Sequence, residues 1–376
     1  MSKIIKRLYP EVIKKTARER IGILTGGGDC PGLNTVIRAV VKCASKRGWD
    51  TIGFLNGFEG LLEPLLYRPL DYKEMDALLF VGGTVLGTSN KGRFAAKTGF
   101  GEANRIPREI LDQARANFQK LGLRAVVVVG GDGSLASAQQ LFEHGVPVVG
   151  VPKTIDNDLE ATTLTFGFDS AVACATDALD RLRTTAQSHD RVMVLEVMGR
   201  YTGWIAVHAG ISGGGDVILI PEIPFRYEDV CAKIADRERE GKHFTLVVIA
   251  EGAREQGGDY VTAGSAEQNR EARLGGIGAV VAAEIQKRTG KETRVCVLGH
   301  LQRGGAPTSF DRLLCTRFGA RAVQLIAEEK YGHMVALRPP DIIAVKLSDA
   351  IGRLRAVPPN GEIVQTARAL GISFGD

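Results

Sequence analysis

The chain lacks the features that mark membrane proteins and nucleic-acid-binding proteins. No apolar stretch approaches the roughly 20 residues that cross a bilayer, and the N-terminus has no apolar core of a signal peptide. Aromatic residues are scarce, at 6%, and no stripe of basic residues is interleaved with them, as nucleic-acid binding would require. The net charge of +5 is too small to indicate a polyanionic partner. We therefore expect a soluble, cytoplasmic protein that binds neither a membrane nor nucleic acid.

Cysteine is also scarce, and its spacing does not indicate a disulfide framework or a metal site. The six cysteines are Cys30, Cys43, Cys174, Cys231, Cys296 and Cys315. None forms a CxxC pair, and none lies near a histidine at the spacing of metal ligands. Such residues are typical of reduced, mostly buried thiols in a protein of the cytosol.

Both common nucleotide-binding fingerprints are absent as well. The first glycine-rich turn, Gly26-Gly27-Gly28-Asp29, follows the apolar run Ile21–Thr25 and precedes a helical pattern. It is not followed by the GK[ST] of a P-loop and does not match GxGxxG. Its backbone N–H groups could cradle a phosphate, or the glycines could only form a tight turn. On its own, this turn leaves both interpretations open.

What the chain does contain is an alternation of short apolar runs and longer amphipathic segments. The apolar runs predict strands at Ile21–Thr25, Thr51–Phe54, Ala125–Val129, Pro147–Val151, Val192–Val197, Val217–Ile220, Phe244–Ile249 and Arg294–Leu298. Helical periodicity separates most of them, for example at Asn34–Lys46, Ser134–His144, Ser170–Gln187 and Gly278–Lys287. Strands that alternate with helices form mainly parallel sheets covered on both faces. We therefore expect an α/β fold of three-layer α/β/α units, with ligands at the carboxyl ends of the strands.

The most informative run joins four valines, Val126–Val129, to the turn Gly130–Ser134. The valines predict a buried parallel strand, and the glycines let backbone N–H groups approach an anion. Asp132 could hold a divalent cation, and Ser134 could begin a helix whose positive end favours phosphate. Alternatively, Asp132 only caps the helix. A cap does not require paired glycines, so the pattern favours phosphate binding.

A second run, Pro152–Asp158, contains groups suited to phosphoryl transfer to an alcohol. That reaction needs a base, a metal ion and positive charge near the phosphate. In an extended segment Asp156 and Asp158 point the same way, so one could accept the proton while the other holds Mg²⁺. Lys153 adds a positive charge beside them. An Asx-rich loop without catalysis is the alternative, but the run directly follows a buried strand, which favours catalysis.

Further polar residues near strand ends are suited to a second phosphate and a polar ligand. They are Arg183, Arg191, Arg200, Glu251, Arg294, His300 and Arg303. An arginine fork can bind two phosphate oxygens at once. Any one of these arginines could instead belong to a surface ion pair. Their placement at strand ends, two of them beside glycines, favours ligand binding.

Taken in order, the motifs GGDG, PKTIDND, MGR and HLQRGG resemble the 6-phosphofructokinase family, of the phosphofructokinase A type, from about Ile21 to Arg312. The resemblance implies two Rossmann-like lobes with the active site between them. Residues 1–166 with about 302–350 would bind the donor, and residues 167–301 with about 351–376 would bind fructose 6-phosphate, after a basic N-terminal arm at 1–20. It implies a glycolytic kinase that phosphorylates the 1-hydroxyl of fructose 6-phosphate with ATP and Mg²⁺.

The resemblance also implies a role for each motif residue. The donor phosphates would contact Gly28, Gly131, Asp132, Gly133, Ser134 and Lys153. Mg²⁺ would be held by Asp132 and Asp158. Asp156 would accept the hydroxyl proton, with Thr154 and Arg200 as further catalytic residues. The sugar phosphate would contact Thr154, Asp156, Arg191, Met198, Gly199, Arg200, Glu251, Arg294, His300 and Arg303. Arg191 and Arg294 would reach it from a neighbouring subunit, which implies a homo-oligomer, usually a tetramer.

Several positions bear on the choice of donor. Lys153 is typical of pyrophosphate-dependent members, whereas those members carry a carboxylate where this chain has Gly133. That carboxylate would repel the α-phosphate of a nucleotide, so its absence favours ATP. Asn90 replaces an arginine that contacts the nucleotide, for which Lys91 or Arg93 could substitute, and Ser137 replaces a glycine near the ribose. The alternatives are a pyrophosphate-dependent phosphotransferase and a non-catalytic sensor of sugar phosphates or nucleotides.

Four charged residues bear on regulation. Arg38, Lys42, Asp216 and Lys242 partly match the effector site of bacterial members, where ADP or phosphoenolpyruvate binds. The match is compatible with allosteric regulation, and ordinary surface charges are the alternative.

Overall fold

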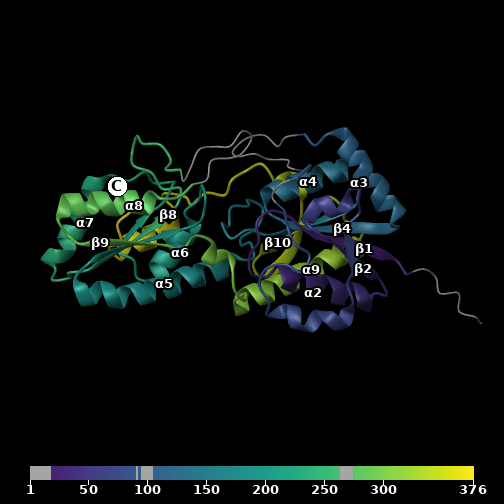
Figure 1. The fold of residues 1–376 in the computed structure, drawn as a ribbon, viewed down its shortest axis with the longest axis horizontal. Coiled ribbons are helices and arrows are strands. Elements are labelled where there is room, and N and C mark those ends of the chain that lie inside the picture. The colour runs from purple at the N-terminus through teal and green to yellow at the C-terminus, as the bar shows by residue number, and fades with distance from the viewer. Residues whose placement is uncertain (1–17, 90–91, 95–104, 263–273) are drawn as a thin grey trace, which may run out of the picture.

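The computed structural model describes residues 18–89, 92–94, 105–262 and 274–376, so most of the predicted basic arm lies outside the described residues. Figure 1 shows two α/β lobes side by side, each built on its own sheet. The strands of residues 20–152 and 333–346 form one sheet, and the strands of residues 192–297 form the other. The expected α/β fold with mainly parallel sheets is confirmed.

Within the described residues, the larger sheet has seven strands in the order β11-β10-β5-β4-β1-β2-β3. They are β1 (Arg20–Thr25), β2 (Asp50–Phe54), β3 (Tyr67–Pro69), β4 (Leu123–Gly130), β5 (Val148–Pro152), β10 (His333–Arg338) and β11 (Asp341–Lys346). The central strands pair in parallel, while β3 and β11 add antiparallel edges. The carboxyl ends of β1, β4 and β5 therefore meet at one edge of the sheet.

Helices cover both faces of this sheet, which explains the uninterrupted valines of β4. The helices of this lobe are α2 (Leu33–Lys46), α3 (Arg108–Lys120), α4 (Asp132–Glu143), α9 (Ser309–Ala327) and α10 (Leu347–Ala350), with the 3₁₀ helices η1 (Gly57–Leu61) and η2 (Tyr72–Leu79). Val127 and Val129 join the apolar cluster of α2 and α9, whereas Val126 and Val128 join that of α3 and α4. All four are fully buried because successive side chains of a strand point to opposite faces.

The smaller sheet has the strand order β7-β8-β6-β9 among the described residues, and all its pairs are parallel. Its strands are β6 (Val192–Val197), β7 (Val217–Leu219), β8 (Thr245–Ala250) and β9 (Thr293–Val297). Its helices are α5 (Phe168–His189), α6 (Trp204–Ser212), α7 (Tyr227–Arg239), α8 (Ile277–Thr289) and α11 (Glu362–Ala369), with the 3₁₀ helix η3 (Gly299–Arg303). Val194 belongs to the apolar cluster on the face of the sheet that α7 and α8 cover, and Leu195 belongs to the cluster on the face that α5 and α6 cover.

A continuous apolar core joins the two lobes. Leu33 of α2 and Phe318 of α9 belong to the same buried cluster as Phe168 of α5 and Trp204 of α6. Burial of this shared surface stabilises one relative arrangement of the two sheets, because the lobes cannot separate without exposing it to water.

The C-terminal segment lies on the smaller sheet, although the strands that precede it belong to the larger one (Figure 1). The Ile218 N–H donates to the Ser373 carbonyl at 2.8 Å, and the Ser373 N–H donates to the Asp216 carbonyl at 3.1 Å. Phe374 is fully buried. Residues after β11 therefore run from one lobe to the other.

The eight predicted strands are confirmed to within two residues at each end, as are the four predicted helices named above. The strands β3, β10 and β11 were not predicted. Among the described residues, no helix is both long and apolar enough to span a membrane.

Candidate functional site

The turn after β1 is shaped by glycines that accept close neighbours. Gly27 has a left-handed φ of 76°, and Gly28 begins the approach to α2. A Cβ atom on Gly26 would lie 2.7 Å from Ser134 Oγ, and one on Gly28 would lie 2.9 Å from Arg303 Nη1. Side chains at these positions would therefore push this turn away from α4 and from Arg303.

The turn after β4 leads directly into α4. Gly131 is the residue before the helix and Asp132 is its first residue, so the alternative that Asp132 caps the helix is wrong, and the helix begins two residues before the predicted Ser134. The Oδ1 atom of Asp132 accepts a hydrogen bond from the Gly352 N–H at 3.0 Å. The turns after β1 and β4 lie together, because the Gly26 N–H donates to the Val129 carbonyl at 2.9 Å and a Cβ on Gly130 would lie 3.4 Å from the Gly26 carbonyl oxygen. Their backbone N–H groups and the positive end of α4 favour a phosphate there.

Two cations hold the carbonyl groups of the first turn. Lys153 is only 4% exposed, and its Nζ donates to the Gly28 carbonyl. Arg303 Nη1 donates to the Asp29 carbonyl at 3.1 Å. Burial lowers the pKa of Lys153, and the positive charge of Arg303 lowers it further. We predicted that Arg303 binds the sugar phosphate. In this structure it contacts the turn after β1, which we predicted to bind the donor phosphates.

The segment after β5 carries the predicted base. The Asp156 N–H donates to Thr154 Oγ1 at 3.1 Å. Asn157 has a left-handed φ of 52°, and its Oδ1 accepts the Thr165 N–H at 3.1 Å. The segment is therefore turned at Asn157, and the expectation of an extended segment is wrong.

The carboxylates of Asp156 and Asp158 are nevertheless close enough to affect each other. Burial raises the pKa of both, and the charges of Asp156 and Asp132 help to raise that of Asp158 to about 7. The charges of Arg303, Arg200 and, less strongly, Lys153 act in the opposite direction on Asp156. One oxygen of each of these two carboxylates is buried and has no hydrogen-bond partner among the described residues.

These carboxylates fit a magnesium ion that shares its ligands with phosphates. The Oδ1 atom of Asp158 has no partner among the described residues, and the carboxylate of Asp132 is close enough to affect the pKa of Asp158. Both side chains offer carboxylate oxygens, the ligands that Mg²⁺ prefers. No group of three or more histidine, cysteine or acidic residues in the described part of the chain could hold a metal by itself. Mg²⁺ is commonly bound by one or two carboxylates together with substrate phosphates and water, so a complete protein cage is not required.

The loop after β6 brings Arg200 to the same region. Gly199 has a φ of 139°, and a Cβ there would lie 2.4 Å from the Thr202 carbonyl oxygen. The Arg200 N–H donates to Glu251 Oε1 at 3.1 Å, which joins the ends of β6 and β8. Burial raises the pKa of Glu251 to about 7, and the charge of Asp156 contributes. Glu251 and Arg200 therefore lie near the predicted base.

The helix η3 completes this side of the site. The Met198 N–H donates to Gln302 Oε1 at 2.8 Å, and Gln302 is fully buried. This bond holds η3 against the end of β6 and leaves His300 exposed to solvent. Met198, Arg200, Glu251, His300 and Arg303 thus come from the carboxyl ends of β6, β8 and β9, as predicted.

Arg191 and Arg294 lie elsewhere. Arg191 precedes β6 and Arg294 is near the start of β9, whereas Met198 follows the other end of β6. A six-residue strand spans about 20 Å, so the two arginines are remote from the site of their own chain. Both pair with Glu292: Arg191 Nε lies 2.8 Å from Glu292 Oε2, and Arg294 Nη2 bonds Glu292 Oε1.

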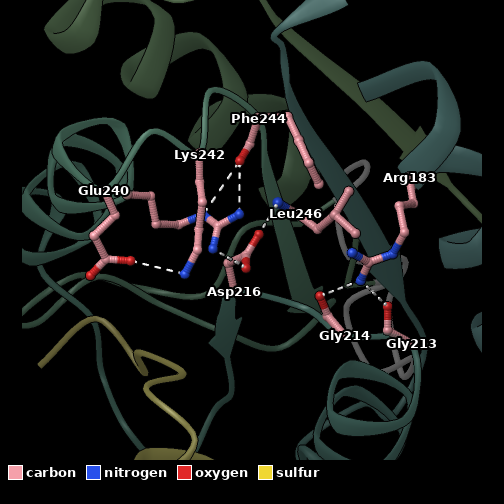
Figure 2. A network of polar contacts seen from close by, with 9 residues as sticks. Arg183, Gly213, Gly214, Asp216, Glu240, Lys242, Phe244 and Leu246 are labelled. Atoms are coloured by element: carbon pink, nitrogen blue, oxygen red, sulfur yellow. Dashed lines mark hydrogen bonds and ion pairs between the residues drawn. The ribbon is translucent and has the colours of Figure 1, made fainter. Parts of the chain in front are cut away.

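Arg183 does not join the site either. Its Nη2 atom donates to the carbonyls of Gly213 and Gly214, at 3.0 Å and 2.8 Å (Figure 2). Asp216 lies in the same network, where it accepts the Leu246 N–H at 2.8 Å and pairs with Arg237 at 2.7 Å.

The charges predicted for an effector site are paired within the chain. Lys242 bonds Glu240 at 2.9 Å (Figure 2), and Arg38 and Lys42 both pair with Asp76. An anionic effector would have to compete with these contacts, so allosteric regulation stays a prediction.

The remaining donor positions have structural partners. Arg93 binds Glu59 Oε2 through Nε at 3.0 Å and Nη2 at 2.9 Å. Ser137 Oγ donates to the Phe94 carbonyl at 2.8 Å. Asn90 and Lys91 lie outside the described residues. The hydroxyl of Ser137 therefore holds a neighbouring segment, which accounts for a serine at this position.

Two threonines that the sequence did not single out support residues 152–158, the segment that carries the predicted base and is here called the catalytic segment. Thr202 Oγ1 donates to the Asp156 carbonyl at 3.1 Å, and Thr165 Oγ1 donates to the Thr154 carbonyl at 2.7 Å. Their bonds reach backbone carbonyls far along the chain, for which the sequence carries no signal.

Together, these contacts place a buried carboxylate between two glycine-rich turns and an arginine. Such a site can accept a proton from an alcohol and transfer a phosphoryl group to it.

Comparison with known proteins gives one consistent result. The phosphofructokinase family model matches residues 20–326. An ATP-dependent 6-phosphofructokinase of Chloroflexus aurantiacus is 54% identical, covering 96% of this chain and 98% of the relative. A pyrophosphate–fructose 6-phosphate 1-phosphotransferase of Amycolatopsis methanolica is 48% identical, covering 90% and 96%. The solved phosphofructokinase of Pichia pastoris in the T-state aligns with a TM-score of 0.76 at 30% identity, over 89% of this chain and 35% of that chain.

The raised pKa of Asp158 predicts a gain in stability when its charge is removed. Between the ordinary aspartate pKa of 3.8 and about 7, the folded chain binds more protons than the unfolded chain, so this carboxylate stabilises less as pH rises. We expect Asp158→Asn to raise the Tm by about 2–4 °C at pH 8, and by less at pH 5. Calorimetry in a chelating buffer checks this. The exposed Asp180→Asn serves as the control, and an equal shift in both variants would contradict the prediction.

Proposed function

Because the chain belongs to the phosphofructokinase family, we propose that it is an ATP-dependent 6-phosphofructokinase, which transfers the γ-phosphoryl group of ATP to the 1-hydroxyl of fructose 6-phosphate. The observation that carries the proposal is the buried, unpartnered carboxylate oxygen of Asp156, close to the charges of Arg200, Arg303 and Lys153. A sensor that only binds sugar phosphates or nucleotides has no need of such a base.

The choice of ATP over pyrophosphate as the donor is supported by the structural role of Lys153. Relatives of similar identity are named for ATP and for pyrophosphate, so Lys153 and Gly133 must be weighed on this chain. The Nζ atom of Lys153 holds the Gly28 carbonyl, so this lysine shapes the donor turn for either donor. A carboxylate at position 133 would exclude a nucleotide, and this chain has none there.

The proposed roles follow from the electrostatics. Asp156 accepts the proton of the sugar hydroxyl, and its burial makes it a stronger base than an exposed aspartate. Arg200 balances the charge of the transferring phosphoryl group. Glu251 accepts hydrogen bonds from sugar hydroxyls, while Met198, Gly199, Thr154, His300 and Arg303 complete the sugar-phosphate site.

The donor phosphates bind the turns after β1 and β4, at Gly28 and at Gly131, Asp132, Gly133 and Ser134. Asp132 and Asp158 hold Mg²⁺, which neutralises part of the phosphate charge and orients the donor when it is bound. A cytoplasmic location belongs to the same proposal. All six cysteines lie in the described residues and form no disulfide, which suits a reducing compartment.

We also propose a homo-oligomer, with a tetramer favoured, in which Arg191 and Arg294 bind the sugar phosphate of a neighbouring subunit. Both arginines are too far from the site of their own chain to serve it. Arg294 lies in β9, an edge strand of its sheet among the described residues, and Arg191 lies just before β6, the strand that pairs with β9. Val295 and Val297 of this strand are 41% and 53% exposed, and an open apolar strand edge is suited to burial against a second copy.

The donor is tested by supplying ATP and pyrophosphate separately, with fructose 6-phosphate and Mg²⁺, and coupling the product to aldolase. We expect turnover with ATP, because nothing at position 133 repels a nucleotide. Turnover with pyrophosphate alone would overturn the donor assignment. No turnover with either donor would overturn the proposed enzyme.

The base is tested with Asp156→Asn, which keeps the size of the side chain but cannot accept the proton. We expect kcat to fall by about 10²- to 10⁴-fold, with the Kd of fructose 6-phosphate changed little. Steady-state kinetics and calorimetric titration measure the two effects. A normal kcat in this variant would exclude Asp156 as the base, and the exposed Asp180→Asn is the matched control.

The shared site is tested by mixing two inactive variants, Asp156→Asn and Arg294→Ala. A hybrid contains one site with an intact Asp156 and an intact Arg294 from the neighbour. If subunits pair at random in two-fold interfaces, refolding an equal mixture together should restore about a quarter of the wild-type activity. Activity no higher than that of the separate variants would show that Arg294 does not act across subunits.

A further inference from the structure

Residues 351–357, here called the crossing segment, run between the two lobes directly beside the site. They follow α10 of the larger-sheet lobe and precede α11, which packs in the lobe of β6–β9, where Figure 1 also marks the C-terminus. None of the motifs that identify the family lies in this segment. Its contacts nevertheless reach both aspartates that we assign to Mg²⁺.

The backbone of the crossing segment forms a hydrogen bond with each of the two aspartates. The Gly352 N–H donates to Asp132 Oδ1 at 3.0 Å. The Arg355 N–H donates to the Asp158 carbonyl at 2.9 Å, and Leu354 forms an antiparallel bridge with Leu159. The first bond orients a carboxylate directly, and the second fixes the backbone that carries the other carboxylate.

Arg355 holds this segment in place. Its guanidinium group lies 4.6 Å from the centroid of the Trp204 ring, and the Trp204 indole N–H donates to the Arg355 carbonyl at 2.8 Å. Arg355 Nη1 donates to the Thr163 carbonyl at 2.6 Å. Trp204 is only 7% exposed and is the first residue of α6. One arginine thus links the crossing segment, the stretch that follows the catalytic segment, and α6.

The far end of the crossing segment is fixed to the start of α6 as well. Glu222 Oε1 accepts the Val357 N–H at 2.8 Å and the Gly203 N–H at 3.0 Å. Gly203 directly precedes α6 and lies three residues after Arg200. The segment is therefore held at Asp132, at Asp158 and at the loop that carries Arg200.

We propose that Arg355 is a positioning residue, which through the crossing segment holds Asp132 and Asp158 at the separation needed to bind a divalent cation together with the donor phosphates. Two carboxylates of like charge repel each other, so their spacing depends on bonds from outside the pair. Groups that orient metal ligands in this way typically change metal affinity or activity by about 10- to 100-fold when removed. The inference rests on the proposed function for the identity of the metal site.

The test uses two mild variants and Mn²⁺ as the probe. Arg355→Lys keeps the positive charge but loses the planar group over Trp204 and the Nη1 bond to the Thr163 carbonyl. Trp204→Phe keeps an aromatic ring under Arg355 but loses the indole N–H. Electron paramagnetic resonance measures Mn²⁺ binding to the protein saturated with a non-hydrolysable ATP analogue. We expect each variant to bind Mn²⁺ about tenfold more weakly than the wild type.

The chain offers a matched control pair away from the site. Arg124 lies 5.2 Å from the centroid of the Trp49 ring, in the larger-sheet lobe. Arg124→Lys and Trp49→Phe make the same chemical changes and should leave Mn²⁺ affinity unchanged. The half-saturating fructose 6-phosphate concentration should move less than twofold in the Arg355 variant, while the Mg²⁺ concentration needed for half-maximal activity rises.

The outcomes separate this inference from the proposed function. Wild-type Mn²⁺ affinity in both site variants, or an equal loss in the control pair, would overturn it. If Arg355→Lys does not fold, Trp204→Phe decides the matter, with circular dichroism and Tm as checks on the fold. A wild-type protein that binds Mn²⁺ with the analogue but does not phosphorylate fructose 6-phosphate would overturn the proposed function, while the Mn²⁺ comparison still tests the role of Arg355.

Discussion

Several carboxylates are packed close together with little access to water, and the rest of the site is arranged around their repulsion. Burial raises the pKa of Asp156, Asp158 and Glu251, and for each of the last two a neighbouring carboxylate adds to the shift. The charges of Arg303, Arg200 and Lys153 offset part of this cost at Asp156. Such an arrangement is unfavourable in the free protein and favourable once cations and phosphates are bound together, which is a general property of pre-organised sites.

The same cations that balance these charges also shape the backbone. Lys153 and Arg303 each bond a carbonyl of the turn after β1, and Arg303 comes from η3 in the other lobe. The conformation of a phosphate-binding turn in one lobe therefore depends on a side chain from the other. The apolar cluster shared by α2, α9, α5 and α6 keeps these partners in register, because relative movement of the lobes would expose it.

Much of the fold and the composition of the site follow from local sequence patterns. Runs of β-branched residues such as Val126–Val129 identify buried strands, and the parallel topology then brings the motifs that follow them to common edges. What could not be predicted depends on long-range or backbone contacts. The turn at Asn157 is held by the backbone N–H of Thr165, and Asp132 is bonded by the backbone N–H of Gly352, a group that almost every residue has. The pairing of Arg191 and Arg294 with Glu292 depends on the neighbouring positions of β6 and β9.

The return of β10 and β11 to the larger sheet has a consequence for the order of folding. Residues 333–346 leave the ribosome long after β5, the strand with which β10 pairs, whereas residues 168–303 supply every strand of the smaller sheet in one continuous stretch. The sheet that begins first along the chain is thus completed last, and until β10 is synthesised β5 presents an unpaired edge. Until then, that edge is open to pairing with a strand of another chain, which is the characteristic hazard of late-completed parallel sheets.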